Sequence, residues 1–483
     1  MTSALKRNLY FSLVAILFLV IESRGGELHL GPLFDEFDLT LSPGHRTEAL
    51  GPLFYDQKQE SETIWAIPPF FAHASDSELD YTEYDICYPF LTLDRFGQQY
   101  RWQLFQLLSW AGGPTQTENE RRRFTLFPVY FQQRSSNPAE NYTAVFPIYG
   151  HLKNRLFRDE ISFTMFPFYG QSRKKDVVTD NYAYPFYHVR HGNGLYGEQF
   201  WPFWGQEHKE ITSVTNGFGD VQMIPGHDQK FILWPFYFND TNNIGTDNPE
   251  WQRASMLSFA LLRSPKRDVT TVIWPFFSVI DDRERKYHER QYLWPIVVVA
   301  RGPGKTTDRV LPFFSVAHSP ELESESYMWP IYKRNGIHSP PLDRVRTRIL
   351  LFLYSDTVQK NTETKASQRR TILLPIFDRR KDYNGDTRLQ VLAPLEPFLP
   401  NVKSIERDYS HVWSFWRAEN SPSRGTASQS LLWNLYRRQT APGEKKCSLL
   451  FGLFQYESHP ESRRVRVFFI PLNKAGRAES AKQ

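Results

Sequence analysis

A short phrase with proline at its centre recurs about every twenty residues along the chain. Two apolar or aromatic residues flank the proline on each side, as in the segment Phe166–Tyr169. Such a period indicates one small structural unit per repeat. Between residues 128 and 202 the spacings are 19, 20, 18 and 17 residues, for Pro128, Pro147, Pro167, Pro185 and Pro202.

Three late copies replace the proline with another residue. Ser414, Asn434 and Gly452 stand in its position, between the same kinds of apolar neighbours. Pro, Ser, Asn and Gly all favour bends and turns, so the position predicts a bulge or kink and argues against a proline that binds a ligand. Copies extend from Pro32 to Pro471, which predicts about 22 units without a domain boundary.

Apolar residues alternate on the N-terminal side of each proline. Ile161, Phe163 and Met165 precede Pro167 in phase with it, whereas the residues between them are polar. This alternation is typical of a strand with one apolar face, and each unit is therefore interpreted as one long strand with the phrase at its middle. Stretches such as 191–194 and 301–304 predict antiparallel hairpin connections. Helical periodicity is nearly absent, and only 102–110 is ambiguous.

The predicted fold class is all-β: a long antiparallel up-and-down meander of Pro-centred repeats of about 20 residues. A flat sheet of this size would expose its edges, so we expect closure into a large β-barrel or barrel-like array. In a membrane barrel the face of Ile161, Phe163 and Met165 would contact lipid. Apolar residues on the other face, such as Phe166 and Phe168, favour a soluble closed or stacked β array instead. A propeller fits less well, because four units need about 80 residues per blade.

The N-terminus resembles a secretory signal peptide. Lys6 and Arg7 precede an apolar run over 9–21, and a polar stretch follows. We therefore predict a signal peptide over 1–23, a single β-repeat array over 24–472 and a polar C-terminal tail over 473–483. An uncleaved anchor is the alternative for the apolar run.

Composition excludes two classes of protein. Aromatic residues make up 16% of the chain, which argues against disorder. The net charge of +5, from 58 basic and 53 acidic residues, is too small to indicate nucleic-acid binding. We expect export to the outer membrane, the periplasm or the cell surface of a Gram-negative-type bacterium, with outer-membrane lipid, a glycan or a peptide as partner.

Candidate chemical motifs favour no catalytic, cofactor-binding or metal-binding residue. Gly192, Gly194 and Gly197 match the pattern of a dinucleotide-binding loop, but another repeat strand follows where a helix is required. A hairpin turn is the better interpretation. The acidic cluster Asp76, Glu78, Asp80 and Glu83 lacks the glycine of a calcium loop, so we interpret it as an exposed loop.

The expected function is that of an exported, non-enzymatic cell-envelope protein, an outer-membrane-type barrel with a structural or pore-like role. The alternatives are a soluble periplasmic or surface module that contacts glycan or peptide through exposed aromatic residues, and a glycan-active enzyme with two carboxylates near residues 76–85. Cys87 and Cys447 form a candidate disulfide, because closure would make early and late units neighbours in an oxidising compartment. Two separate buried thiols are the alternative.

Overall fold

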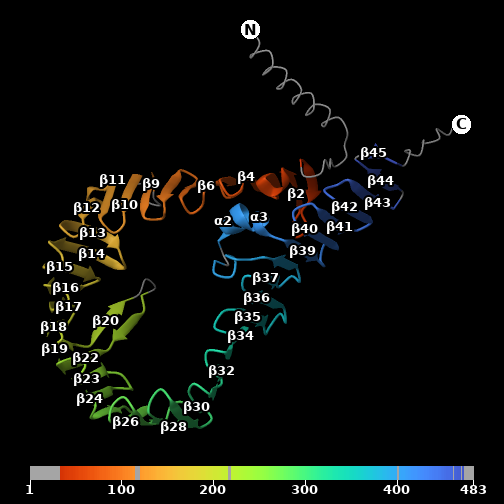
Figure 1. Cartoon of the computed structure of the whole chain (residues 1–483). Helices are drawn as coiled ribbons and strands as arrows, with labels where there is room; N and C mark the ends of the chain where they lie inside the picture. Colours follow the sequence, from red (N-terminus) through yellow and green to blue (C-terminus); the bar gives the residue numbers. More distant parts are fainter. Residues whose placement is uncertain are drawn as a thin grey trace. The chain divides into compact units, whose positions relative to one another are not determined.

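The computed structural model describes residues 33–114, 120–215, 219–399, 402–460, 462–468 and 470–472. The predicted signal peptide over 1–23 and the polar tail over 473–483 lie outside the described residues. Strands that follow each other in sequence pair antiparallel, in one long meander that includes every assigned strand except β20 and β21 (Figure 1). The predicted all-β antiparallel meander is therefore confirmed.

The chain divides into two compact units. Unit 1 combines the two ends of the chain, up to Gly97 and from Ser367 onward. Its strands are β1 (Asp35–Asp38), β2 (Gly44–Ala49), β3 (Phe54–Gln59), β4 (Glu62–Ile67), β5 (Phe71–Asp76), β6 (Tyr81–Ile86), β7 (Leu91–Phe96), β36 (Ser367–Leu373), β37 (Phe377–Lys381), β38 (Thr387–Val391), β39 (Trp416–Ser421), β40 (Thr426–Leu431), β41 (Tyr436–Ala441), β42 (Glu444–Leu449), β43 (Phe454–Ser458), β44 (Arg463–Val467) and β45 (Ile470–Pro471).

Unit 2 extends from Gln98 to Ala366. Its strands are β8 (Gln99–Leu104), β9 (Leu108–Pro114), β10 (Glu120–Leu126), β11 (Tyr130–Ser135), β12 (Tyr142–Val145), β13 (Tyr149–Arg155), β14 (Arg158–Thr164), β15 (Tyr169–Lys174), β16 (Val177–Tyr182), β17 (Tyr187–Gly192), β18 (Leu195–Phe200), β19 (Trp204–Lys209), β20 (Thr212–Thr215), β21 (Val221–Ile224), β22 (Gly226–Ile232), β23 (Tyr237–Ile244), β24 (Glu250–Ser255), β25 (Phe259–Arg263), β26 (Arg267–Val272), β27 (Phe277–Asp282), β28 (Tyr287–Tyr292), β29 (Val297–Arg301), β30 (Thr306–Val310), β31 (Phe314–His318), β32 (Leu322–Tyr327), β33 (Tyr332–Ser339), β34 (Leu342–Ile349) and β35 (Tyr354–Asn361).

The proline phrases form tight turns between strands. β14 ends at Thr164 and β15 begins at Tyr169, and between them the amide of Phe168 donates to the carbonyl of Met165 at 2.8 Å. The peptide before Pro167 is cis, as in a type VI turn. The same hydrogen bond and cis peptide recur at Pro69, Pro89, Pro128, Pro147, Pro185, Pro202, Pro235, Pro275, Pro295 and Pro330.

The interpretation of each repeat as one long strand is therefore wrong. Each repeat is a hairpin, and the strands of unit 2 are four to eight residues long. Two such strands with their two turns account for the period of about twenty residues. The expectation that the variable position needs a turn-forming residue agrees with the turns at Asn434 and Gly452.

Closure of the array stays a prediction. Among the described residues, β1 pairs with β2 and β45 pairs with β44, and no pairing joins β1 to β45. The segment Gly192–Gly197 forms the turn between β17 and β18 and the start of β18, which confirms the hairpin interpretation of its glycines. The ambiguous stretch 102–110 belongs to β8, a turn and β9.

A small apolar cluster lies within β11–β14 of unit 2. Phe131, Tyr142, Ala144, Leu152 and Phe163 are buried together. Phe163 is only 5% exposed, so it is not available for the lipid contact expected of it, whereas Met165 belongs to a turn and is 56% exposed. Alternation continues from the strand into the turn, so the pattern of residues did not mark where the strand ends.

One helical segment interrupts the strands of unit 1. It consists of α2 (Lys403–Ile405), the π-helical turn η3 (Glu406–Ser410) and α3 (His411–Trp413), and η3 packs against β4 and β5 (Figure 1). Two 3₁₀ turns, η1 (Gly51–Leu53) and η2 (Pro138–Glu140), complete the described elements. The helical segment was not predicted from the sequence, because it is too short to establish a helical period.

Candidate functional site

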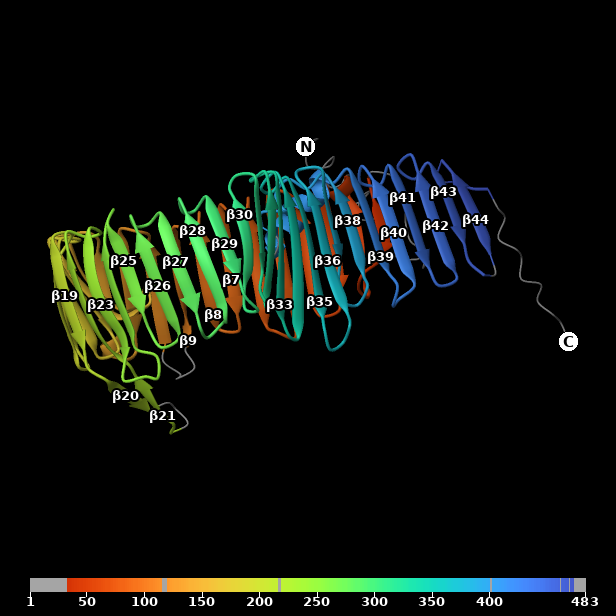
Figure 2. The same cartoon turned by 90° about the horizontal axis from the view of Figure 1, so that it is seen from below.

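The turns at one edge of the unit 2 sheet contain no Asp, Glu, Lys or Arg. In an antiparallel meander every second turn lies at the same edge, and these turns carry the proline phrases (Figure 2). We call this set the apolar turn edge. It comprises residues 105–107, 127–129, 146–148, 165–168, 183–186, 201–203, 233–236, 256–258, 273–276, 293–296, 311–313, 328–331 and 350–353.

Large apolar side chains of the apolar turn edge are exposed. Trp234 is 50% exposed and Phe236 is 55% exposed, although large apolar side chains of this kind are usually buried. The same holds for Phe127, Ile148, Met165, Phe168, Tyr184, Phe186, Phe203, Leu233, Leu257, Ile273, Leu293, Trp294, Ile296, Phe313, Met328, Trp329, Ile331 and Phe352. Exposed apolar surface that is continuous along an edge marks a contact site for a protein, a ligand or a membrane.

The opposite edge of the unit 2 sheet has a different composition. Its turns include the run Arg283–Lys286, with four charged residues, and Lys175 with Asp176. We call this edge the polar turn edge. Leu156 and Phe157 are apolar residues of this edge, and Phe157 is 98% exposed. The turns of the polar turn edge therefore carry charged side chains, whereas the turns of the apolar turn edge carry none.

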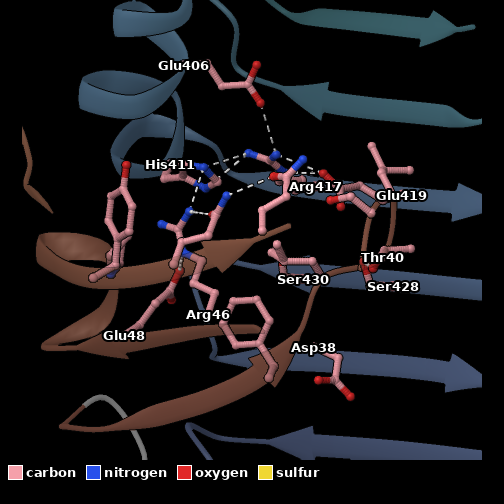
Figure 3. A pocket seen from close by; sticks show the side chains of 18 of the residues that line it. Asp38, Thr40, Arg46, Glu48, Glu406, His411, Arg417, Glu419, Ser428 and Ser430 are labelled. Carbon is pink, nitrogen blue, oxygen red and sulfur yellow. Dashed lines mark hydrogen bonds and ion pairs between the residues drawn. The ribbon is translucent and has the colours of Figure 1, made fainter. Parts of the chain in front are cut away.

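A second feature is a cavity of about 360 Å³ within unit 1, lined by both charged and apolar side chains. Strands β1–β4 supply one wall, β38–β41 supply the other, and the helical segment 403–413 lies beside both (Figure 3). Residues two apart on a strand point to the same face, which places Arg46 with Glu48, Arg417 with Glu419, and Ser428 with Ser430 toward the cavity.

Arginine side chains around the cavity pair with neighbouring carboxylates. Arg46 Nε lies 2.8 Å from Glu48, and Arg417 Nη2 lies 2.8 Å from Glu419. The remaining pairs are Arg388 with Glu406 and Glu419, and Arg437 with Asp35 and Glu48. Burial acts to raise the pKa of Glu406, but Arg388 and Arg417 outweigh it and lower this pKa to about 2.

His411 lies between two of these arginines. Arg46 Nη1 is 2.9 Å from its Nε2, and Arg417 Nη1 is 3.1 Å from its Nδ1 (Figure 3). Burial, together with the positive charges of Arg46 and Arg417, lowers the pKa of His411 well below its ordinary value. The imidazole is therefore neutral at pH 7 and can accept only one hydrogen bond.

Arg407 joins the helical segment to β6. Its guanidinium lies 2.9 Å from Glu83 and also pairs with Asp85. Burial and the negative charge of Asp85 raise the pKa of Asp408, although Arg407 opposes them. Breaking such a pair leaves a buried charge without compensation, so this cluster stabilises unit 1 only while it is complete.

The acidic cluster expected near residue 76 does not gather into one site. Asp76 accepts hydrogen bonds from the amides of Glu78 and Leu79, whereas Glu83 pairs with Arg407. Within the part of the chain that the structure describes, no group of three or more His, Cys, Asp or Glu residues could hold a metal ion. The two ends of the cluster therefore serve different structural roles.

Contacts across the cavity join early and late parts of the chain. Thr40 Oγ1 donates to Ser428 Oγ at 2.6 Å, and Gln439 Nε2 donates to the Asp38 carbonyl at 3.1 Å. Cys87 is exposed, Cys447 is partly buried and both are free thiols in this structure, so the disulfide between them stays a prediction for the oxidised protein.

None of the cavity residues was predicted as a site residue from the sequence. Arg46 and His411 are 365 positions apart, and nothing in either segment signals the other. The sequence led us to expect exposed aromatic residues as an alternative contact surface, but it placed the proline phrases in the middle of strands and not in turns.

No helix in the described residues has the length and apolar character needed to cross a membrane. Comparison with known proteins assigns no relative: no family model matches the chain, and no curated protein matches it.

Proposed function

We propose that the chain is an exported, non-enzymatic protein of the cell envelope of a Gram-negative-type bacterium, and that unit 2 rests on outer-membrane lipid through its apolar turn edge. The observation that carries this proposal is the row of exposed, charge-free turns. In this role the β-repeat array is a structural scaffold that holds the turns in line at a lipid surface.

The chemistry of the turns fits the boundary between lipid and water. Trp and Tyr are enriched at membrane interfaces, where the ring meets the acyl chains and the polar atom meets the headgroups. Trp234, Trp274, Trp294 and Trp329 stand directly before the prolines of their turns. A lipid layer also accommodates a long row of similar apolar residues without matching each one, whereas a protein partner would need a complementary shape at every turn.

The strands favour contact with the surface of the lipid layer over passage through it. A membrane-spanning strand needs about 9–11 residues, whereas the strands of unit 2 have four to eight. β34 also carries Arg344, Arg346 and Arg348 along one face, where lipid contact would be costly. These features support a peripheral position, in which only the turns enter the interface.

Flotation with lipid vesicles tests the proposal. The full chain should float with phosphatidylcholine vesicles, and replacement of Trp234, Trp274, Trp294 and Trp329 by Gln should reduce the bound fraction at least tenfold. Phe157→Gln is the matched control, because it removes an exposed aromatic residue from the polar turn edge and should leave flotation unchanged. A wild-type chain that stays with the soluble fraction, or equal losses in both variants, would overturn the proposal.

A further inference from the structure

The cavity of unit 1 contains a buried donor without an acceptor. Arg46 is 2% exposed; its Nη1 reaches His411 and Gln57, and its Nε pairs with Glu48. Among the described residues, no atom accepts a hydrogen bond from its Nη2. A buried donor left without a partner costs about 1–3 kcal/mol. Arg46 lines the cavity, and the donor on its Nη2 is left unused by the described residues.

His411 increases the excess of donors at the same point. Arg46 and Arg417 approach its two ring nitrogens, and guanidinium groups can only donate. One nitrogen of the neutral ring accepts, so the other carries a proton and faces a second donor (Figure 3). An anion next to Arg46 and Arg417 would accept from both guanidinium groups and relieve this conflict.

The rest of the cavity has a mixed lining, with apolar side chains such as Phe37, Ile64 and Trp433 beside hydroxyl and amide groups. Thr40, Ser42, Ser428 and Ser430 contribute hydroxyl groups, and Gln59 contributes an amide. Glu48 and Glu419 add acceptors beside the arginines. Paired donors and acceptors of this kind suit a ligand that has several hydroxyl groups, each of which both donates and accepts.

We propose that this cavity binds a sugar acid, such as a uronic acid unit of a glycan, with its carboxylate beside Arg46 and Arg417 on the cavity side of His411. Arginine recognises carboxylates through paired N–H donors, and the hydroxyl-lined wall of β40 meets the sugar hydroxyls. The volume of about 360 Å³ lies at the small end of the range for ligand pockets, which suits one or two sugar rings. The proposal stands independently of the lipid contact of unit 2.

Isothermal titration of the full chain with three probes tests the ligand class. Glucuronate should bind, whereas glucose and inorganic phosphate should bind at least tenfold more weakly, because glucose lacks the charge and phosphate lacks the hydroxyl pattern. Absence of glucuronate binding overturns the proposal. Equal binding of glucose excludes the role of the carboxylate, and equal binding of phosphate shows a general anion site; either result overturns it.

Two variants locate the site. Arg46→Lys keeps the charge but removes the paired donors, and should weaken glucuronate binding at least tenfold. Ser430→Leu fills the cavity from β40, at a position with no ion pair to break, and should abolish binding while the melting temperature stays within a few degrees of the wild type. Ser172→Leu on β15 of unit 2 is the matched control. Unchanged binding in folded Ser430→Leu protein overturns the assignment to this cavity.

Discussion

The apolar turn edge of unit 2 and the ion-paired cavity of unit 1 depart from the usual distribution of residues in opposite directions. In unit 2, Trp234 and Phe236 are half exposed, whereas in unit 1 Arg46 and Glu48 are almost fully buried. Exposed apolar patches and buried polar groups are the informative exceptions to the burial rule. Both units are built from the same kind of hairpin repeat. The exposed apolar edge and the ion-paired cavity therefore differ through their side chains and not through the backbone.

The comparison also separates stability from function. The charges of unit 1 are matched by partners within the unit and tie the first strands to the last ones, for example Arg437 on β41 to Glu48 on β2. The exposed side chains of the apolar turn edge add little to folding, because they remain in water. Substitutions in the ion pairs of unit 1 should therefore affect stability, whereas substitutions in the apolar turn edge of unit 2 should affect lipid contact and not folding, and the following predictions test that division.

The largest expected effect on stability comes from Arg407→Ala. Removal of one partner from a buried ion pair costs about 3–5 kcal/mol, because Glu83 and Asp85 would keep their charges without compensation. Amide hydrogen exchange of β5 and β6 should show this loss as a lower opening free energy. Arg283→Ala is the control: its pair with Asp268 is exposed and screened by water, so its loss should leave the opening free energy of neighbouring strands nearly unchanged. Equal losses would contradict the distinction.

A smaller effect is expected from a pair of leucines in unit 2. Leu152 is 2% exposed in the apolar cluster, whereas Leu257 is 58% exposed at the apolar turn edge. Leu152→Ala should lower the free energy of unfolding by about 3 kcal/mol, and Leu257→Ala should change it by less than about 1 kcal/mol. Urea denaturation measures both. A comparable loss from Leu257→Ala would mean that the turn edge is part of the folding core.

The smallest stability effect is expected from pH. The pKa of His411 is lower in the folded chain than the unfolded value of about 6.5. A group with a lowered folded pKa contributes its full stability above the unfolded pKa, and this contribution is lost as the pH falls below it. Unit 1 should therefore lose stability between pH 7 and pH 5, as measured by urea denaturation. His411→Gln should reduce this dependence; an unchanged slope would exclude His411 as its source.

The sequence predicted the meander and its period but not the position of the turns. Ile161, Phe163 and Met165 keep the same alternation, yet Phe163 belongs to a strand and Met165 has a left-handed backbone with φ of 49°. Periodicity alone cannot separate a strand from a turn that continues its phase. The charge contrast between the two edges could have done so, because every second connection is charge-free.

The cavity could not be predicted in the same way. Its key contacts join Arg46 to His411 and Thr40 to Ser428, residues separated by more than three hundred positions. Local patterns report only on neighbours within a few residues, whereas these pairs depend on how the first strands meet the last. A repeat sequence is especially uninformative here, since many units could supply a similar strand.

The most direct test of the central claim compares the two turn edges on one chain. An environment-sensitive dye is attached to a single cysteine, at Phe236→Cys on the apolar turn edge or at Phe157→Cys on the polar turn edge, with Cys87→Ser and Cys447→Ser in both variants. On addition of phosphatidylcholine vesicles, the emission at position 236 should rise and shift to shorter wavelength, whereas the emission at position 157 should stay as in water. A shift at 157 alone, at both positions or at neither would contradict the account.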